Sequence, residues 1–68
     1  MHDIVITNIL PELRARHRIT QDGLAIAVGV TRQTIISIEK GAYTPSLPLA
    51  LALGKYFSLP VEDIFTIS

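Results

Sequence analysis

The chain has 68 residues, enough for one compact domain at most, and a domain this small buries only about 60% of its unfolded surface. Nearly half of the residues are hydrophobic and 18% are charged, a composition that excludes a disordered chain. Six lysines and arginines balance six acidic residues, so the net charge gives no support for a nucleic-acid partner, although a local basic face stays open.

The residue types also narrow the chemistry. Cysteine is absent and histidine occurs twice, which argues against disulfides, a zinc site or another cofactor. The N-terminus lacks the features of a signal peptide, and the longest apolar run, residues 47–54, is far below the roughly 18 residues that cross a bilayer, so we expect a cytoplasmic protein. There is no cysteine nucleophile, no glycine-rich phosphate loop and no pair of carboxylates apart from the adjacent Glu62 and Asp63, so we expect no enzymatic activity.

Both ends of the chain are rich in β-branched residues. Residues 3–7 predict one short strand, and residues 65–68 predict a second. Because the termini of small domains often lie close together, the two strands could pair.

Between these ends, apolar residues recur with the period of a helix. The first predicted helix spans residues 8–17, with Ile9, Leu10 and Leu13 on its apolar side. The second begins after Thr20, whose hydroxyl can accept a hydrogen bond from a free N–H group of the first turn.

The same pattern repeats at once. Gly29 ends the second helix, and Thr31 caps a third that runs to Lys40 and stops at Gly41. Since only Gly29 and Val30 separate the two helices, they must cross steeply, which is the helix-turn-helix arrangement.

Two further helices complete the chain. Ser46 caps a fourth over residues 47–57, and Pro60 opens a short fifth over residues 61–65. The sequence therefore predicts one all-α domain of five helices over residues 1–68, with a short strand at each end.

The third predicted helix holds the candidate binding residues. Successive helical residues lie 100° apart, which puts Ile35, Ile38 and Glu39 on its inner side. The outer side, an arc of about 140°, holds a row of mostly hydrogen-bonding side chains that have no expected partner inside the domain. These are Arg32, Gln33, Ile36, Ser37 and Lys40.

That row suits the major groove of DNA. Arginine can donate two hydrogen bonds to guanine, glutamine matches adenine, and an aliphatic side chain such as Ile36 can touch a thymine methyl. Thr31 and Thr34 add hydroxyls at the helix N-terminus, where a phosphate is attracted. The alternative interpretation is a solvated helix face without a partner.

Many spaced residues match a known family. They are Leu13-Arg14, Ile19-Thr20-Gln21, Leu24-Ala25, Val28 to Ile35, Ile38 to Gly41, Tyr43, Pro45-Ser46, Leu49 to Leu51 and Val61 to Phe65. The pattern covers roughly residues 8–65 and resembles the Cro/C1-type (Xre family) helix-turn-helix regulators, above all their compact stand-alone members. The resemblance implies a lambda-repressor-like fold and a transcriptional regulator, expected to be a repressor, that binds duplex DNA.

The resemblance also implies roles for single residues. Arg32, Gln33 and Ser37 match base-reading positions, with Ile36 between them. Phosphate contacts are implied for Gln21, Thr34 and Lys40, and more weakly for Tyr43 and Thr44 in the loop that follows.

Two further positions bear on the structure around that helix. Arg14 and Glu39 match an ion pair between the first and third helices, which agrees with the inward direction of Glu39. Arg18 departs from the pattern, because the family usually has glycine there. Either Arg18 adopts a strained left-handed conformation or that turn differs.

The fourth helix is apolar nearly all the way round. Its core side is expected to hold Leu47, Ala50, Leu51, Gly54 and Phe57, which leaves a second stripe of Leu49, Ala52, Leu53 and Tyr56. We expect a homodimer on a near-palindromic site, since helix-turn-helix dimers read two half-sites one turn of duplex apart. The predicted interface is Leu49, Leu53, Tyr56, Leu59, Val61, Ile64 and Phe65. The alternative is that the fifth helix and terminal strands of the same chain cover the stripe.

An alternative function, binding to a protein in place of DNA, stays open. The same fold could serve as a protein-interaction module, such as an antitoxin that grips its toxin with the third helix. No small-molecule effector domain is expected within this length, so regulation would act through DNA affinity, the dimer or another protein.

Overall fold

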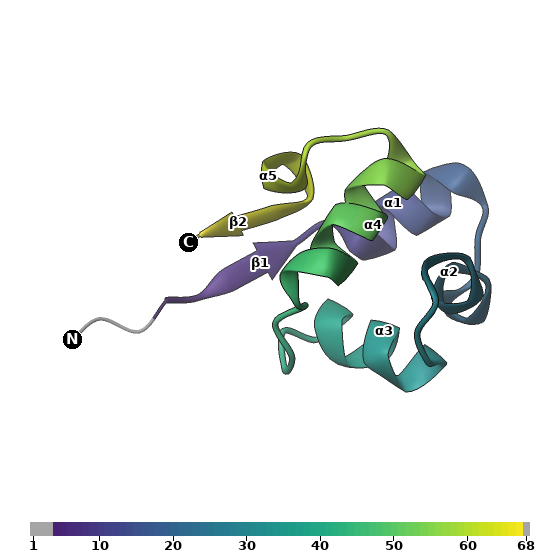
Figure 1. The fold of residues 1–68 in the computed structure, drawn as a ribbon, viewed down its shortest axis with the longest axis horizontal. Helices are drawn as coiled ribbons and strands as arrows, with labels where there is room; N and C mark the ends of the chain where they lie inside the picture. The colour runs from purple at the N-terminus through teal and green to yellow at the C-terminus, as the bar shows by residue number, and fades with distance from the viewer. Residues whose placement is uncertain (1–3, 68) are drawn as a thin grey trace.

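The computed structural model describes residues 4–67. Its elements are, in chain order, β1 (Ile6–Asn8), α1 (Leu10–His17), α2 (Gln21–Val28), α3 (Arg32–Glu39), α4 (Leu47–Phe57), α5 (Val61–Ile64) and β2 (Phe65–Ile67). Figure 1 shows both strands and α5 at the end of the molecule opposite to α2. The five helices and the strand pair confirm the predicted lambda-repressor-like architecture.

The terminal strands form an antiparallel pair. Ile6 lies opposite Ile67, and Asn8 lies opposite Phe65. The predicted first strand over residues 3–7 is therefore shifted, since β1 covers Ile6–Asn8; residue 3, like residue 68 of the second predicted strand, lies outside the described residues.

Three helix boundaries differ from the sequence prediction. α3 ends at Glu39, one residue before the expected Lys40. The other two differ because the end residues of the predicted helices belong to the strand pair. Asn8 belongs to β1, and its side-chain oxygen accepts a hydrogen bond from the N–H of Leu10, so α1 begins only at Leu10. Phe65 has extended backbone and starts β2, whereas it was expected to end the fifth helix.

The predicted helix caps are confirmed. Thr20, Thr31 and Ser46 each accept a hydrogen bond from the backbone N–H three residues ahead, at 2.9, 3.2 and 3.3 Å. Gly29 ends α2 with a left-handed φ of 79°. Arg18 ends α1 with a φ of 53°, so the first of the two alternatives for this residue is correct: it takes the left-handed conformation.

The core is one apolar cluster that draws on all five helices. Its buried members are Leu10, Leu13, Leu24, Ala25, Ile35, Ile38, Leu49, Leu53, Phe57 and Ile64. Ile9, expected on the apolar side of the first helix, is 36% exposed, because it precedes α1 and its N–H is bonded to the carbonyl of Ile64. The cluster holds α3 from one side only, which leaves the other side free.

The buried side of α4 agrees with the prediction at Ala50, Gly54 and Phe57, which are buried, but differs from it at four leucines. Leu47 and Leu51 are 70% and 55% exposed, whereas Leu49 and Leu53 are buried. Periodicity could not decide between the two sides, because apolar residues surround the helix. The packing of α4 against both α2 and α5 decides, because it places Leu49 and Leu53 in the core cluster. The chain after α4 also passes so close to the helix that a Cβ at Gly54 would lie 2.8 Å from the backbone carbonyl oxygen of Leu59.

The described residues hold neither a bilayer-length helix nor a cluster of metal ligands. Among residues 4–67, no helix combines the length and the apolar character needed to cross a membrane. Within the same residues, no three histidine or acidic side chains gather closely enough to hold a metal ion.

Candidate functional site

α3 begins where the turn after α2 sends the chain in a new direction. The N–H of Val30 donates to the carbonyl of Ala25 at 2.9 Å, which closes the end of α2. Thr31 then caps α3, and its hydroxyl oxygen lies 2.9 Å from that of Thr34. The two predicted hydroxyls thus lie together beside the free N–H groups of the first turn of α3.

Two isoleucines fix the rotation of α3. Ile35 is fully buried and Ile38 is 2% exposed, so the predicted inner side of the helix does face the core. Because helical residues lie 100° apart, burial of this pair turns Arg32 and Gln33 to solvent, and both are exposed.

An ion pair ties the last turn of α3 to α1. Arg14 donates from Nε to Oε2 of Glu39 at 2.6 Å and from Nη2 to Oε1 at 3.1 Å, while its Nη1 donates to the carbonyl of Ile19. The side chains of Arg14 and Glu39 are only 19% and 7% exposed, so water screens the pair weakly. The predicted ion pair is therefore present.

The electrostatics of this pair favour a permanent charge on the arginine. The hydrogen bond to Glu39 raises the pKa of Arg14 above its ordinary value, although partial burial acts in the opposite direction. The guanidinium therefore stays protonated across the whole neutral range, and the ion pair persists there.

Gln21 differs from what the sequence suggested. It was expected to point outward as a phosphate contact, but its side-chain Nε2 donates to Oε1 of Glu39 at 3.0 Å and the residue is half-buried. Glu39 thus accepts hydrogen bonds from α1 and α2 at once. A phosphate contact by Gln21 stays a prediction, but its amide already has a structural partner.

The other predicted DNA-contacting residues share one surface. Arg32, Gln33 and Lys40 are exposed, and Ile36 and Ser37 are half-buried on the same outer side of α3. Among these five described residues the one side-chain hydrogen bond is exposed and long, from Nε2 of Gln33 to Oγ of Ser37 at 3.3 Å. The outer side of α3 therefore offers donors and acceptors that nothing in the described domain occupies firmly.

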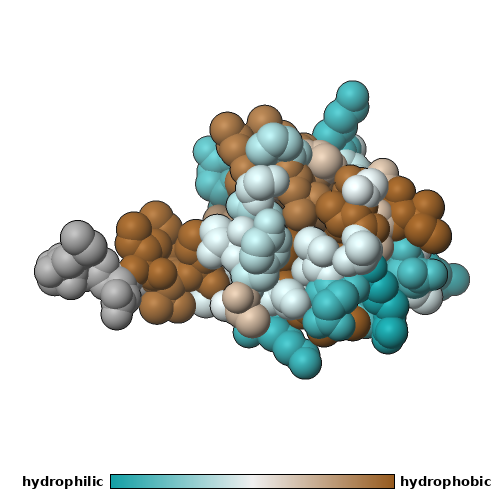
Figure 2. Space-filling view, turned by 60° about the horizontal axis from the view of Figure 1, so that its bottom comes forward, coloured by the Kyte–Doolittle hydropathy of each residue, from teal (hydrophilic) through white to brown (hydrophobic). Residues whose placement is uncertain are grey.

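The loop after α3 extends this surface. Tyr43 borders an open hollow beside the helix. Its lining is Thr31, Gln33, Thr34, Ser37, Ala42 and Tyr43. Thr44 is exposed but does not line this hollow. It lines two others that include residues of β1, so it lies less directly beside the outer side of α3 than Tyr43 does. Figure 2 shows hydrophilic and intermediate side chains over this side of the molecule, away from the apolar N-terminal segment.

The predicted dimer interface is wrong in three of its seven residues. Leu49, Leu53 and Ile64 are core residues, 7%, 0% and 1% exposed, so a partner could not reach them in the folded domain. The reason is the rotation of α4 described above. Tyr56 is exposed, and the remaining three, Leu59, Val61 and Phe65, are half-buried.

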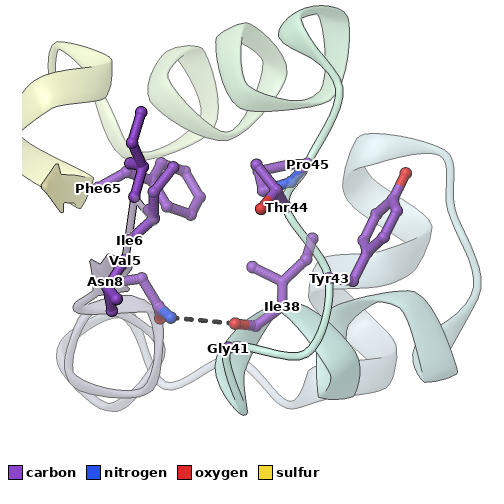
Figure 3. A pocket seen from close by; sticks show the side chains of 10 residues that line it. Val5, Ile6, Asn8, Ile38, Gly41, Tyr43, Thr44, Pro45 and Phe65 are labelled. Carbon is purple, nitrogen blue, oxygen red and sulfur yellow. Dashed lines mark hydrogen bonds between the residues drawn. The ribbon is translucent and has the colours of Figure 1, made fainter. Parts of the chain in front are cut away.

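Sequence reasoning missed one residue that touches α3. Asn8 accepts a hydrogen bond from Leu10 N–H through Oδ1, and it donates through Nδ2 to the carbonyl of Ile38 at 3.0 Å (Figure 3). An asparagine before a helix is a recognisable capping signal. The second bond joins positions 30 residues apart and ends on a main-chain oxygen, so no side-chain pattern could reveal it.

Comparisons with known proteins agree with this geometry. A family model described as helix-turn-helix matches residues 12–64, from the first turn of α1 to the end of α5. The chain is 55% identical over 58 residues to an uncharacterized HTH-type transcriptional regulator of Methanocaldococcus jannaschii. This alignment covers 85% of this chain and 88% of that protein. Identity and coverage are the same for the uncharacterized HTH-type transcriptional regulator YgzD of Bacillus subtilis.

A more distant relative has a more specific name. The chain is 28% identical over 53 residues to the cryptic phage CTXphi transcriptional repressor RstR of Vibrio cholerae. That alignment covers 78% of this chain and 48% of the repressor.

Proposed function

The chain belongs to the Cro/C1-type family of helix-turn-helix transcriptional regulators, and from this premise we propose that it binds duplex DNA as a homodimer and represses transcription. In this proposal α3 enters the major groove and its outer side reads the bases. Residues of the surrounding turns hold the phosphate backbone. The function is one of binding and involves no catalytic step.

One observation carries the proposal. α3 is fixed from its inner side by Ile35, Ile38 and the Glu39 ion pair, while hydrogen-bonding side chains on its outer side stay exposed. A reading helix needs both properties, because base recognition depends on donors and acceptors held in a constant position. An ordinary solvated helix needs only the polar surface.

Within this surface the roles follow from chemistry and position. Arg32, at the first residue of α3, suits a guanine through two parallel hydrogen bonds, and Gln33 suits an adenine. Ser37 lies one turn further along with Ile36 beside it, where an aliphatic group can touch a thymine methyl. Lys40 follows the last residue of α3, and its ammonium group suits a phosphate.

A second copy of the chain is proposed to cover apolar surface near the terminal strands. Val61 and Phe65, two of the predicted interface residues, border a shallow hollow with almost no polar lining. Its other lining residues are Ile6, Thr44, Pro45 and Ala50. Leu51 follows Ala50 on α4 and is largely exposed. A two-fold pair would present two copies of α3 to half-sites about 34 Å apart.

The dimer has its own test. Leu51→Glu places a charge on the exposed leucine that follows Ala50 in the sequence, and it is expected to shift the protein from dimer to monomer in sedimentation equilibrium. Ile26→Glu is the matched control, because Ile26 is an aliphatic residue of the same size on α2 and is even more exposed. A wild-type protein that sediments as a monomer at concentrations that saturate its DNA would contradict the homodimer.

Repression and a cytoplasmic location belong to the proposal as well. The naming of RstR as a repressor supports the first. A small protein bound across a promoter acts most simply by excluding other proteins from that DNA.

Selection from random duplex DNA tests the reading surface. Wild type is expected to enrich an inverted repeat, and Arg32→Ala should lose preference at one symmetric position, at about 1–3 kcal/mol for a lost bidentate contact. Arg16→Ala is the control, since Arg16 is an exposed arginine of α1. Enrichment of no sequence by wild type, even at low salt, would favour a protein partner for α3.

A further inference from the structure

Asn8 connects the terminal sheet to the last turn of α3. The residue ends β1, where it pairs with Phe65 of β2, and it is half-buried. Figure 3 shows its side chain crossing from β1 toward the carbonyl group of Ile38, with Tyr43 and the loop after α3 beyond. Among the described residues, no other side chain forms a hydrogen bond from the sheet to α3.

The two bonds of Asn8 fix which way its amide points. The N–H of Leu10 requires an oxygen, and the carbonyl of Ile38 requires an N–H donor. Turning the amide over would break both bonds and set like atoms against each other. The amide of Asn8 therefore links Leu10 to Ile38 in one orientation only.

The acceptor, the carbonyl of Ile38, lies in the last turn of α3, where other polar bonds also hold the helix. The carbonyl of Ile38 also accepts from the N–H of Gly41 at 3.0 Å, which shapes the exit of the chain toward Tyr43. The next residue, Glu39, carries the ion pair to α1. Two consecutive residues of α3 are thus held by polar bonds from different elements.

We propose that Asn8 is a positioning residue for DNA reading: its Nδ2 holds the C-terminal turn of α3 so that the outer side of the helix meets the bases at the correct depth. The inference rests on the proposed function. It gives the terminal sheet a role beyond closing the fold, because β1, β2 and α3 then move as one unit. The N–H of Ile9, bonded to the carbonyl of Ile64, reinforces that unit.

Substitutions can separate the two bonds of Asn8. Asn8→Asp keeps an oxygen for the N–H of Leu10 but replaces the donor with a second oxygen facing the Ile38 carbonyl. Asn8→Ser keeps a capping oxygen without a charge and is too short to reach α3. Thr7→Ala is the matched control: it removes a side-chain bond of the same strand, from Oγ1 of Thr7 to the carbonyl of Thr66, and leaves α3 untouched.

The first readout is DNA selectivity of the folded protein. Affinity is measured for the duplex selected by wild type and for a scrambled duplex of the same length, at a temperature where every variant is folded. Both Asn8 variants are expected to lower the ratio of the two affinities about three- to tenfold, the effect of one lost neutral hydrogen bond. Thr7→Ala should leave the ratio unchanged.

The second readout needs no DNA. Backbone amide NMR signals of the free protein should shift at Gly41 and Ser37 in both Asn8 variants, in addition to the neighbours of residue 8. Variants that lose thermal stability, keep the wild-type ratio and leave the α3 signals in place would show that Asn8 only caps α1, and the inference would be wrong. A wild type that prefers no duplex overturns the proposed function instead, and the NMR shifts then decide the role of Asn8 alone.

Discussion

Replacing Arg14 by methionine tests how the ion pair positions α3. Methionine keeps much of the aliphatic stem but leaves the Glu39 carboxylate, 7% exposed, with one remaining donor among the described side chains, the amide of Gln21. Three hydrogen bonds of the guanidinium group are lost, two to Glu39 and one to the carbonyl of Ile19, and breaking a buried pair from one side costs about 3 kcal/mol. A domain of this size is stable by only about 3–10 kcal/mol, so the loss is a large fraction of the total.

A double-mutant cycle isolates the pair from the packing of its stems. Arg14→Met, Glu39→Met and the double variant are compared with wild type by urea unfolding, followed by circular dichroism at one protein concentration. The double variant should be more stable than Arg14→Met, since it leaves no unpaired charge. We expect a coupling energy of about 1.5–3 kcal/mol.

Salt and pH refine this prediction. Because Arg14 and Glu39 are mostly shielded from water, the coupling should survive molar salt, which suppresses surface ion pairs. The pKa of Arg14 is raised, so its contribution to folding is present below the ordinary arginine value and is lost only above it. The coupling should hence be equal at neutral and mildly alkaline pH. A coupling below about 0.5 kcal/mol, or one abolished by salt, would refute the structural role of the pair.

Three further changes have outcomes fixed by the geometry, each measured by thermal unfolding. Gly54→Ala should destabilise the protein by about 1–3 kcal/mol, since the added Cβ would press on the backbone after α4. Ala52→Gly is the control on the same helix and should cost less. Arg18→Gly should stabilise by about 0.5–1 kcal/mol, because glycine takes the left-handed conformation without strain; an unchanged or lower melting temperature would count against that conformation. Ser46→Ala should cost about 1 kcal/mol through the lost cap of α4, and Ser46→Asp should restore most of it.

Local signals in the sequence were sufficient for the helix-turn-helix unit. Thr20, Thr31 and Ser46 act within four residues of their own position, so each cap could be predicted without knowing the rest of the fold. The same holds for Ile35 and Ile38, because only one side of α3 is apolar enough to enter the core. These elements also define most of the candidate site.

Features that depend on distant parts of the chain could not be predicted in this way. Leu49 and Leu53 were assigned to an interface because α4 offers two apolar sides, and only the packing of α4 against both α2 and α5 shows that these two leucines belong to the core. Gln21 was expected at a phosphate because the carboxylate that holds it is 18 residues away. Asn8 was missed because its partner is a main-chain carbonyl.

The central claim is that the outer side of α3 is the surface that meets DNA. It is tested most directly by titrating isotope-labelled protein with the selected duplex and recording which backbone and side-chain amide signals move. We expect the largest changes from Thr31 to Lys40, with the side-chain amide of Gln33 among them, and smaller ones at Tyr43. Changes confined to α4 and the terminal strands, with the α3 signals unmoved, would contradict the account.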